Sequence, residues 1–236
     1  MKYRAVFFDR DGTLSHQDPQ IAAERDRRIS KIVGKPFELD DKLNMKLFFG
    51  VWDLHPELKP VRDLETENKF WREWFQLLLV ELTGVNNTER NAEILCREFV
   101  FYKIMKLYPE TIEVLEYFTK KGLKIGVISD TFLSLELTLN LLGIREYFDS
   151  VTASSLVGVG KPDPRIFNHA LAETGVSASE SYFVDDTKPE ADGARRLGFT
   201  SFHLDRDSKS TAEWSIATLN DLVEYDKRAI SYSCGG

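Results

Sequence analysis

The sequence has little cysteine and no long hydrophobic run. Its two cysteines, Cys96 and Cys234, are too few for a disulfide framework or a structural zinc site. No stretch of about 18 apolar residues occurs, so a membrane-spanning helix is not expected. The first residues also lack an apolar segment followed by a small-residue cleavage site, which argues against a signal peptide. Together these absences predict a protein of the cytoplasm, with no membrane partner.

An excess of positive charge is also missing. The chain carries 31 Lys and Arg residues against 38 Asp and Glu residues, for a net charge of −7. A nucleic-acid surface needs a concentrated basic face, so no nucleic-acid partner is expected. An anionic ligand would need a local cation to offset the overall negative field.

Outside residues 16–107, the chain alternates between short apolar runs and helical patterns. The runs predict strands at 3–8, 123–129, 182–184 and 200–204, with a weaker candidate at 150–153. The helices are expected at 110–121, 133–142, 164–174 and 189–197, and a glycine follows each one. Such alternation predicts an α/β fold with a doubly wound parallel sheet.

Residues 16–107 break this alternation, since they contain no convincing strand. Apolar residues spaced three and four apart predict helices near 18–34, 40–49, 66–84 and 88–104, with a loop at 50–63. We therefore expect a helical cap over 16–107, inserted after the first strand of a core formed by 1–15 and 108–236.

Polar clusters follow the predicted strands. They are Asp9 and Asp11 with Thr13, then Ser129 and Asp130, then Lys161, and finally Asp185 and Asp186. Ligands bind at this edge of open α/β sheets, so the clusters are expected to converge. Two carboxylates about 4 Å apart repel by roughly 4 kcal/mol at an effective dielectric constant of about 20. The acids therefore require a divalent cation, and oxygen ligands favour Mg²⁺. With Lys161, the cation would form a pocket suited to phosphate.

The same segments carry a family resemblance. Residues 7–14 (FFDRDGTL) resemble the first motif of the haloacid dehalogenase-like (HAD) phosphatase superfamily, and residues 128–130 (ISD) resemble the second. Residues 160–167 (GKPDPRIF) match the third, and 183–186 (FVDD) resemble the fourth. The motifs occur in the family's order, and the helical insertion has the position of a C1-type cap.

The resemblance implies roles for individual residues. Asp9 would attack phosphorus and form an aspartyl-phosphate, and Asp11 would act as general acid and then general base. Ser129 and the amides that follow it, from Asp130 onward, would bind phosphoryl oxygens, and Lys161 would neutralise charge there.

The resemblance also implies a Mg²⁺ site. Its ligands would be the Asp9 carboxylate, the backbone carbonyl of Asp11 and the acids of the fourth motif. Asp186 is expected to be the primary ligand among those acids. Asp185 would be either a second ligand or an outer-shell partner.

The predicted function is hydrolysis of a small phosphomonoester, and three alternatives are weighed beside it. A phosphomutase keeps Asp11 and fits the same motifs. A 2-haloacid dehalogenase releases halide, which needs no proton, so Asp11 would have no task. A phosphoacceptor signalling module places its acidic pair first in the chain, whereas Asp185 and Asp186 come last here. Sugar phosphates, phosphoglycolate and nucleotide monophosphates all fit as substrates, and the sequence carries no signal for an oligomeric state.

Overall fold

The computed structural model describes residues 2–84, 88–207 and 212–233, and Cys234 lies outside them. The chain forms two compact units. An α/β unit contains Met1–His16, Leu107–Thr131 and Leu139–Gly236, and a helical unit contains Gln17–Lys106 and Phe132–Thr138. The expected division differs from this one chiefly at 132–138, which groups with the helices instead of the core.

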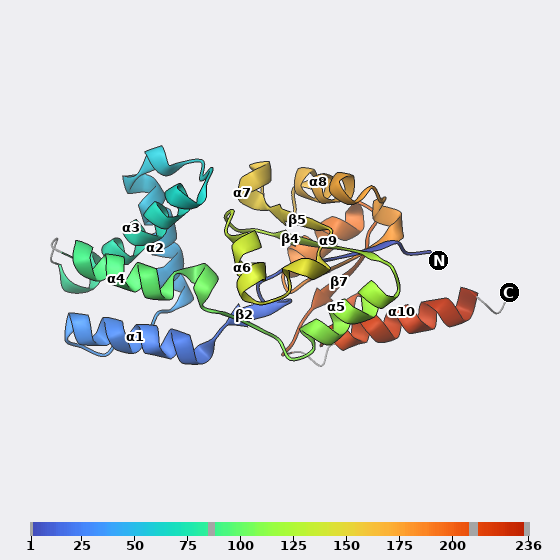
Figure 1. The fold of residues 1–236 in the computed structure, drawn as a ribbon, viewed down its shortest axis with the longest axis horizontal. Coiled ribbons are helices and arrows are strands. Elements are labelled where there is room, and N and C mark those ends of the chain that lie inside the picture. Colours follow the sequence, from blue (N-terminus) through green and yellow to red (C-terminus); the bar gives the residue numbers. More distant parts are fainter. Residues whose placement is uncertain (1, 85–87, 208–211, 234–236) are drawn as a thin grey trace. The chain divides into compact units, whose positions relative to one another are not determined.

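The α/β unit is built on a parallel sheet. Among the described residues its strand order is β5-β4-β1-β6-β7-β8, and every neighbouring pair is parallel. The strands are β1 (Ala5–Phe8), β4 (Lys124–Ser129), β5 (Ser150–Ala153), β6 (Ser181–Asp185), β7 (Thr200–Leu204) and β8 (Ser215–Ile216) (Figure 1). The predicted doubly wound parallel fold is thus confirmed.

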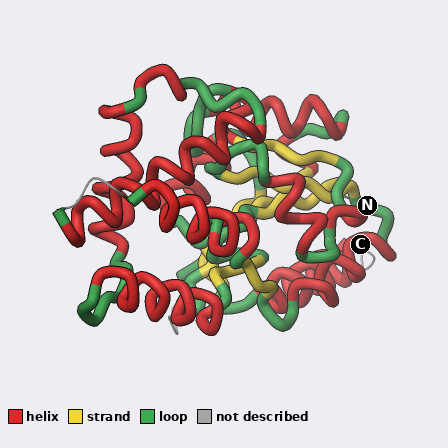
Figure 2. The backbone as a smooth tube through the Cα atoms, turned by 60° about the vertical axis from the view of Figure 1, so that its left-hand side comes forward, coloured by secondary structure: helices red, strands yellow, loops and turns green. Residues whose placement is uncertain are grey.

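Helices cover both faces of this sheet (Figure 2). They are α5 (Thr111–Lys120), α7 (Ser154–Val157), α8 (Pro164–Thr174), α9 (Lys188–Arg196) and α10 (Leu219–Ser233), while α6 (Leu135–Leu141) begins in the segment that groups with the helical unit. Phe7 packs against Phe199 on the face of α8 and α9, whereas its neighbour Phe8 faces Phe118 of α5. Because adjacent strand residues point to opposite faces, β1 is apolar throughout and lies buried at the centre.

The strand order fixes where a ligand can bind. The chain adds β4 and β5 on one side of β1, then returns to add β6 and β7 on the other. A reversal of this kind leaves a crevice at the carboxyl ends of the strands on either side of it. Here those strands are β1 and β6, which end beside Asp9 and at Asp185.

The helical unit contains α1 (Pro19–Val33), α2 (Asp41–Leu54), α3 (Leu64–Thr83) and α4 (Glu89–Phe99). Aspartates cap the first three helices: the side chains of Asp18, Asp40 and Asp63 each accept a hydrogen bond from a first-turn amide. Short 3₁₀ turns in the described residues lie at Pro56–Leu58, Phe101–Lys103, Arg145–Tyr147 and Ala178–Glu180, the first two in this unit.

The segment 132–138 is anchored within the helical unit. Phe132 stacks on Phe48 and packs edge-on against Phe70. The buried Glu67 carboxylate accepts hydrogen bonds from the Ser134 amide at 2.9 Å and the Ser134 hydroxyl at 2.5 Å. An aromatic contact and a charge-assisted hydrogen-bond pair therefore fix this segment among the helices.

The predicted loop at 50–63 is wrong in its first part, since α2 continues to Leu54. Leu47 and Val51 are both buried and lie four residues apart, so the apolar face runs past Gly50. A side chain at Gly50 would approach Leu77 of α3 to 2.9 Å, so the glycine permits close helix packing. The helix ends at Leu54 because helical geometry is disfavoured at His55, the residue before Pro56.

Several elements went unpredicted. The two-stranded pair β2 (Ser15–Gln17) and β3 (Met105–Leu107) and the edge strand β8 are too short to leave an alternating pattern. Helix α10, which closes the α/β unit, was not predicted either.

No helix in the described ranges is long and apolar enough to cross a membrane.

A buried polar network attaches α10 to the rest of its unit. The Asp226 carboxylate accepts hydrogen bonds from Tyr117 at 2.7 Å and Tyr182 at 3.1 Å, and it pairs with Lys121. We expect Asp226→Ala to destabilise the protein by about 3 kcal/mol, because the buried Tyr182 and the partly buried Tyr117 and Lys121 lose their shared acceptor. Urea denaturation followed by circular dichroism measures the change. Glu224→Ala on the same helix removes only an exposed ion pair with Lys227, so its midpoint should match that of the wild type. Equal midpoints for the two variants would contradict the role given to this network.

Candidate active site

The first acidic cluster sits directly after the central strand. The Asp9 amide donates to the Val184 carbonyl at 2.9 Å, which extends the pairing of β1 with β6. Asp9 is only 5% exposed, so its carboxylate points into a largely dry environment. The turn that follows begins at Arg10 and passes through Gly12, whose φ is 76°.

Gly12 is required for two reasons. Its positive φ is strained for any residue with a Cβ atom. A Cβ atom there would also overlap the Asp186 carboxylate. The close approach is stabilised on the other side by Thr13, whose hydroxyl accepts a hydrogen bond from the Asp186 amide at 3.2 Å. The first-motif turn and the fourth-motif acid are therefore in direct contact.

Lys161 lies at the centre of the site. Its ammonium is 2.7 Å from Asp9 Oδ1, 2.6 Å from Asp185 Oδ2 and 2.9 Å from Glu190 Oε2. The side chain is 1% exposed, and the Lys161 amide donates to Asp130 at 2.9 Å. Lys161 thus holds Asp9 of the first cluster and Asp185 of the fourth together at one edge of the sheet.

Three carboxylates form a group that could hold a cation. Ligand oxygens of Asp9, Asp185 and Asp186 all lie within 4.8 Å of one another. Oxygen-only ligands of this kind suit a hard divalent ion such as Mg²⁺. The donor set therefore fits the metal that the sequence predicts.

The electrostatics of the site also fit an additional cation. Burial raises the pKa of Asp9 well above its usual value, even though Lys161 opposes the shift, and Asp185 raises it further. Loss of hydration and the charge of Asp185 raise the pKa of Asp186 to about 6. Burial raises the pKa of Glu190 to about 7 despite its contact with Lys161. One lysine does not offset this many acids, and a divalent ion would lower these pKa values again.

The second cluster contributes in two different ways. Ser129 ends β4 and is buried, and within the described ranges no protein group hydrogen-bonds its hydroxyl, which leaves that group available to a ligand. Asp130 instead accepts the Lys161 amide, and a side chain at Gly160 would collide with it. The geometry gives Asp130 the task of holding the loop that carries Lys161.

Asp11 lies apart from the acidic group. Its carboxylate accepts two hydrogen bonds from the neighbouring Arg10 and is 38% exposed. Of the predicted metal ligands, Asp9, Asp185 and Asp186 thus have carboxylates that converge, while the part expected of Asp11 rests on its backbone carbonyl.

Sequence reasoning missed three residues of this site. Glu190 lies in the first turn of α9, where acidic residues are common because they interact favourably with the helix dipole. Its position therefore gave no sign of a role in the site. Arg206, which donates to the Gly12 and Thr13 carbonyls, lies almost 200 residues from them in sequence. Arg10 stands between two motif acids, and that position is the only signal that could have drawn attention to it.

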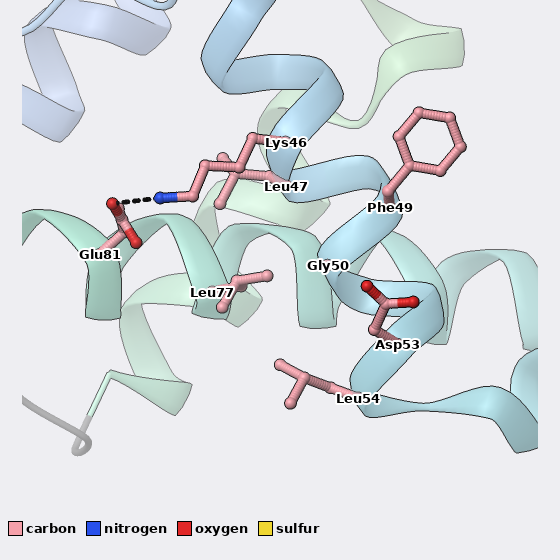
Figure 3. Close-up of a pocket in the computed structure, with 8 residues that line it drawn as sticks. All are labelled: Lys46, Leu47, Phe49, Gly50, Asp53, Leu54, Leu77 and Glu81. Atoms are coloured by element: carbon pink, nitrogen blue, oxygen red, sulfur yellow. Dashed lines mark hydrogen bonds and ion pairs between the residues drawn. The ribbon is translucent and has the colours of Figure 1, made fainter.

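A separate pocket lies within the helical unit between α2 and α3 (Figure 3). It is lined by Lys46, Leu47, Phe49, Gly50, Asp53, Leu54, Leu77 and Glu81. Its lysine already pairs with Glu81 at 2.6 Å, and none of the motif residues lines it. The reactive groups converge in the α/β unit instead.

Comparison with known proteins assigns the family. The model of the haloacid dehalogenase-like hydrolases matches residues 3–198, which include all four motifs. The chain belongs to this family. The resemblance found in the sequence is therefore confirmed, and the protein is a HAD-like hydrolase.

Relatives of this HAD-like hydrolase include named phosphatases. It is 28% identical to phosphatase MT3486 of Mycobacterium tuberculosis over 231 residues, which cover 94% of this chain and 96% of the relative. It is 24% identical to glyceraldehyde 3-phosphate phosphatase of Methanocaldococcus jannaschii over 95% of this chain and 97% of the relative. A crystal structure of a 2-haloacid dehalogenase from Pseudomonas syringae shares the fold, with a TM-score of 0.66 and 24% identity over 96% of this chain and 99% of that one.

The contact between Gly12 and Asp186 can be tested with a matched pair of variants. Gly12 and Gly122 have nearly the same φ, 76° and 74°, but nothing lies within 4 Å of a Cβ atom at Gly122. Gly122→Ala should therefore cost about 1 kcal/mol of stability from backbone strain alone. Gly12→Ala should cost about 2 kcal/mol more, because its Cβ atom would also overlap the Asp186 carboxylate and displace it. Melting temperatures of the two variants measure the difference, and equal losses would show that the Asp186 carboxylate moves aside freely.

Proposed function

We propose that this HAD-like hydrolase cleaves small phosphomonoesters with Mg²⁺, using Asp9 as nucleophile and Asp11 as general acid and base. The observation that carries the proposal is the convergence of the Asp9, Asp185 and Asp186 carboxylates, the first two of which pair with the buried Lys161 ammonium. The Lys161 ammonium and a bound Mg²⁺ would give this acidic protein a local positive charge that attracts a phosphate group. The matching of relatives named as phosphatases supports the same chemistry.

The reaction has two steps. In the first, an Asp9 oxygen attacks phosphorus while the ester P–O bond breaks, and Asp11 gives its proton to the departing alkoxide. In the second, Asp11 takes a proton from water, and the water oxygen attacks the phosphorus of the aspartyl-phosphate. The P–O bond to Asp9 then breaks, inorganic phosphate leaves, and both acids return to their starting states.

The hydrogen bonds of Asp9 leave one oxygen for this attack. Oδ1 accepts from Lys161, whereas Oδ2 has no hydrogen bond within the described residues. Lys161 thus orients the nucleophile and offsets the charge of the phosphoryl oxygens, and the Ser129 hydroxyl is available to donate to one of them. Mg²⁺, when bound, supplies further charge neutralisation at the phosphoryl group.

The contacts of the fourth-motif acids favour different roles for the two residues. Asp185 uses both oxygens within the protein, since Oδ1 accepts the Thr187 amide at 2.8 Å and Oδ2 accepts Lys161. We therefore assign direct metal ligation to Asp186 and an outer-shell, orienting role to Asp185.

Other reactions of this fold fit the site less well. Halide needs no proton on leaving, so dehalogenation gives Asp11 no task. A phosphomutase would use the same residues, and its products distinguish it: a mutase isomerises a sugar phosphate, whereas a hydrolase releases free phosphate. The substrate proposed is a small phosphorylated metabolite located in the cytoplasm, in line with relatives named as glyceraldehyde 3-phosphate and phosphoglycolate phosphatases.

The nucleophile is tested by Asp9→Asn, which keeps the size of the side chain and removes its charge. Phosphate release from a panel of small phosphomonoesters should fall by a factor on the order of 10³ or more. Asp53→Asn is the matched control, because Asp53 is exposed and has no hydrogen bond or ion pair among the described residues. Undiminished turnover in Asp9→Asn would remove the proposed nucleophile.

The metal is tested by chelation and by binding. Phosphate release should stop in EDTA and return when Mg²⁺ is restored. Mg²⁺ should also raise the melting temperature of the wild-type protein, since it binds only the folded chain, and should leave that of Asp186→Asn unchanged. A full rate in chelator would overturn the metal requirement, and a normal Mg²⁺ response in Asp186→Asn would overturn the ligand assignment alone.

A further inference from the structure

Arg10 is the largest fully buried residue of the described chain, and it stands between the two acids of the first motif. Its Nε donates to Asp11 Oδ1 at 2.8 Å, and its Nη2 donates to Asp11 Oδ2 at 2.5 Å. The same Nη2 donates to the Thr131 hydroxyl at 3.2 Å. Thr131 follows β4, two residues after Ser129, so Arg10 connects the loops of the first and second motifs.

This arrangement fixes the orientation of a carboxylate. Two parallel N–H···O bonds from one guanidinium hold both the position and the plane of the carboxylate that accepts them. The Arg10 side chain is 0% exposed, while that of Asp11 is 38% exposed. Arg10 therefore holds Asp11 from its buried side and leaves the opposite side open to a ligand.

We propose that Arg10 is the positioning residue for Asp11, and that Thr131 in turn fixes the guanidinium of Arg10. This inference rests on the proposed function, because it concerns the residue that donates a proton to the leaving group. Arg10 itself is too buried to touch a substrate, so it acts only through Asp11. Lysine could not replace it fully, since an ammonium donates from a single point and does not define the plane of a carboxylate.

The dependence of rate on the leaving group separates this role from a general structural one. A good leaving group such as p-nitrophenolate departs without a proton, whereas an alkoxide needs one. The comparison uses kcat/KM, which reports only the steps up to formation of the aspartyl-phosphate. It therefore excludes the later hydrolysis step, in which Asp11 acts as general base. The substrates are p-nitrophenyl phosphate and an alkyl phosphate such as glycerol phosphate.

With Arg10→Gln we expect kcat/KM for the alkyl phosphate to fall about 100-fold and that for p-nitrophenyl phosphate to fall less than about 5-fold. Asp11→Asn should show the same selective loss, and the double variant should be no worse than Asp11→Asn alone. Arg10→Lys should recover part of the stability but little of the alkyl-phosphate rate. KM for p-nitrophenyl phosphate should change little, because Arg10 contacts no substrate.

Arg206→Gln is the matched control. Arg206 donates to the Gly12 and Thr13 carbonyls of the same turn, at 3.1 and 2.7 Å, without contacting Asp11. Any loss it causes should therefore be equal for the two substrates. If Arg10→Gln does not fold, Thr131→Val provides the second test, since it removes one acceptor of Arg10 and should give a smaller loss with the same preference.

The outcomes distinguish this inference from the proposed function. Equal losses for both substrates in folded Arg10 variants, or in Thr131→Val, would overturn the positioning role alone. Wild-type protein that releases no phosphate from either ester, or Asp11→Asn without a leaving-group preference, would overturn the proposed function and this inference with it.

Discussion

The ammonium of Lys161 is the contact on which the site depends. It touches carboxylates from three places in the chain: the end of β1, the end of β6 and the first turn of α9. Burying several acids together is unfavourable unless cations accompany them. The carboxylates raise the pKa of Lys161 well above its usual value although burial opposes this, so the lysine stays charged. Its charge ties the carboxyl edge of the sheet into one site.

The sheet makes that contact possible. Parallel strands bring their carboxyl ends to a common edge of the sheet. Because β1 and β6 are direct neighbours in the sheet, Asp9 lies beside Asp185. The first-motif turn then passes so close to Asp186 that only glycine fits at position 12. The positions of the acids therefore follow from backbone topology before any side-chain interaction is formed.

The sequence predicted the parts of this protein that leave a regular pattern. Apolar runs followed by charged residues located β1, β4 and β6, and glycine after each helix located most helix ends, including the bounds of α8. The proximity of Asp9 and Asp185 could be predicted because it follows from strand order, whereas Lys161 joins them from the loop after α7. The roles of these residues, in contrast, rest on the family resemblance.

Features that depend on tertiary packing left no such pattern. Gly50 suggested the end of a helix, but it serves close packing of α2 against α3. The segment 132–138 was assigned to the core by its place in the chain, whereas Phe132 and Ser134 make their contacts among the helices. The pairing of Arg10 with Asp11 could not be predicted either, because neighbouring residues in an extended chain usually point apart.

The helical unit is consequently not a simple insertion. Besides Gln17–Lys106, it also contains the seven residues Phe132–Thr138, which begin directly after Thr131. Deleting residues 17–106 and joining the ends would therefore remove the apolar residues against which Phe132 and Leu137 now pack. A minimal α/β hydrolase cut from this chain would need polar replacements at those two positions to stay in solution.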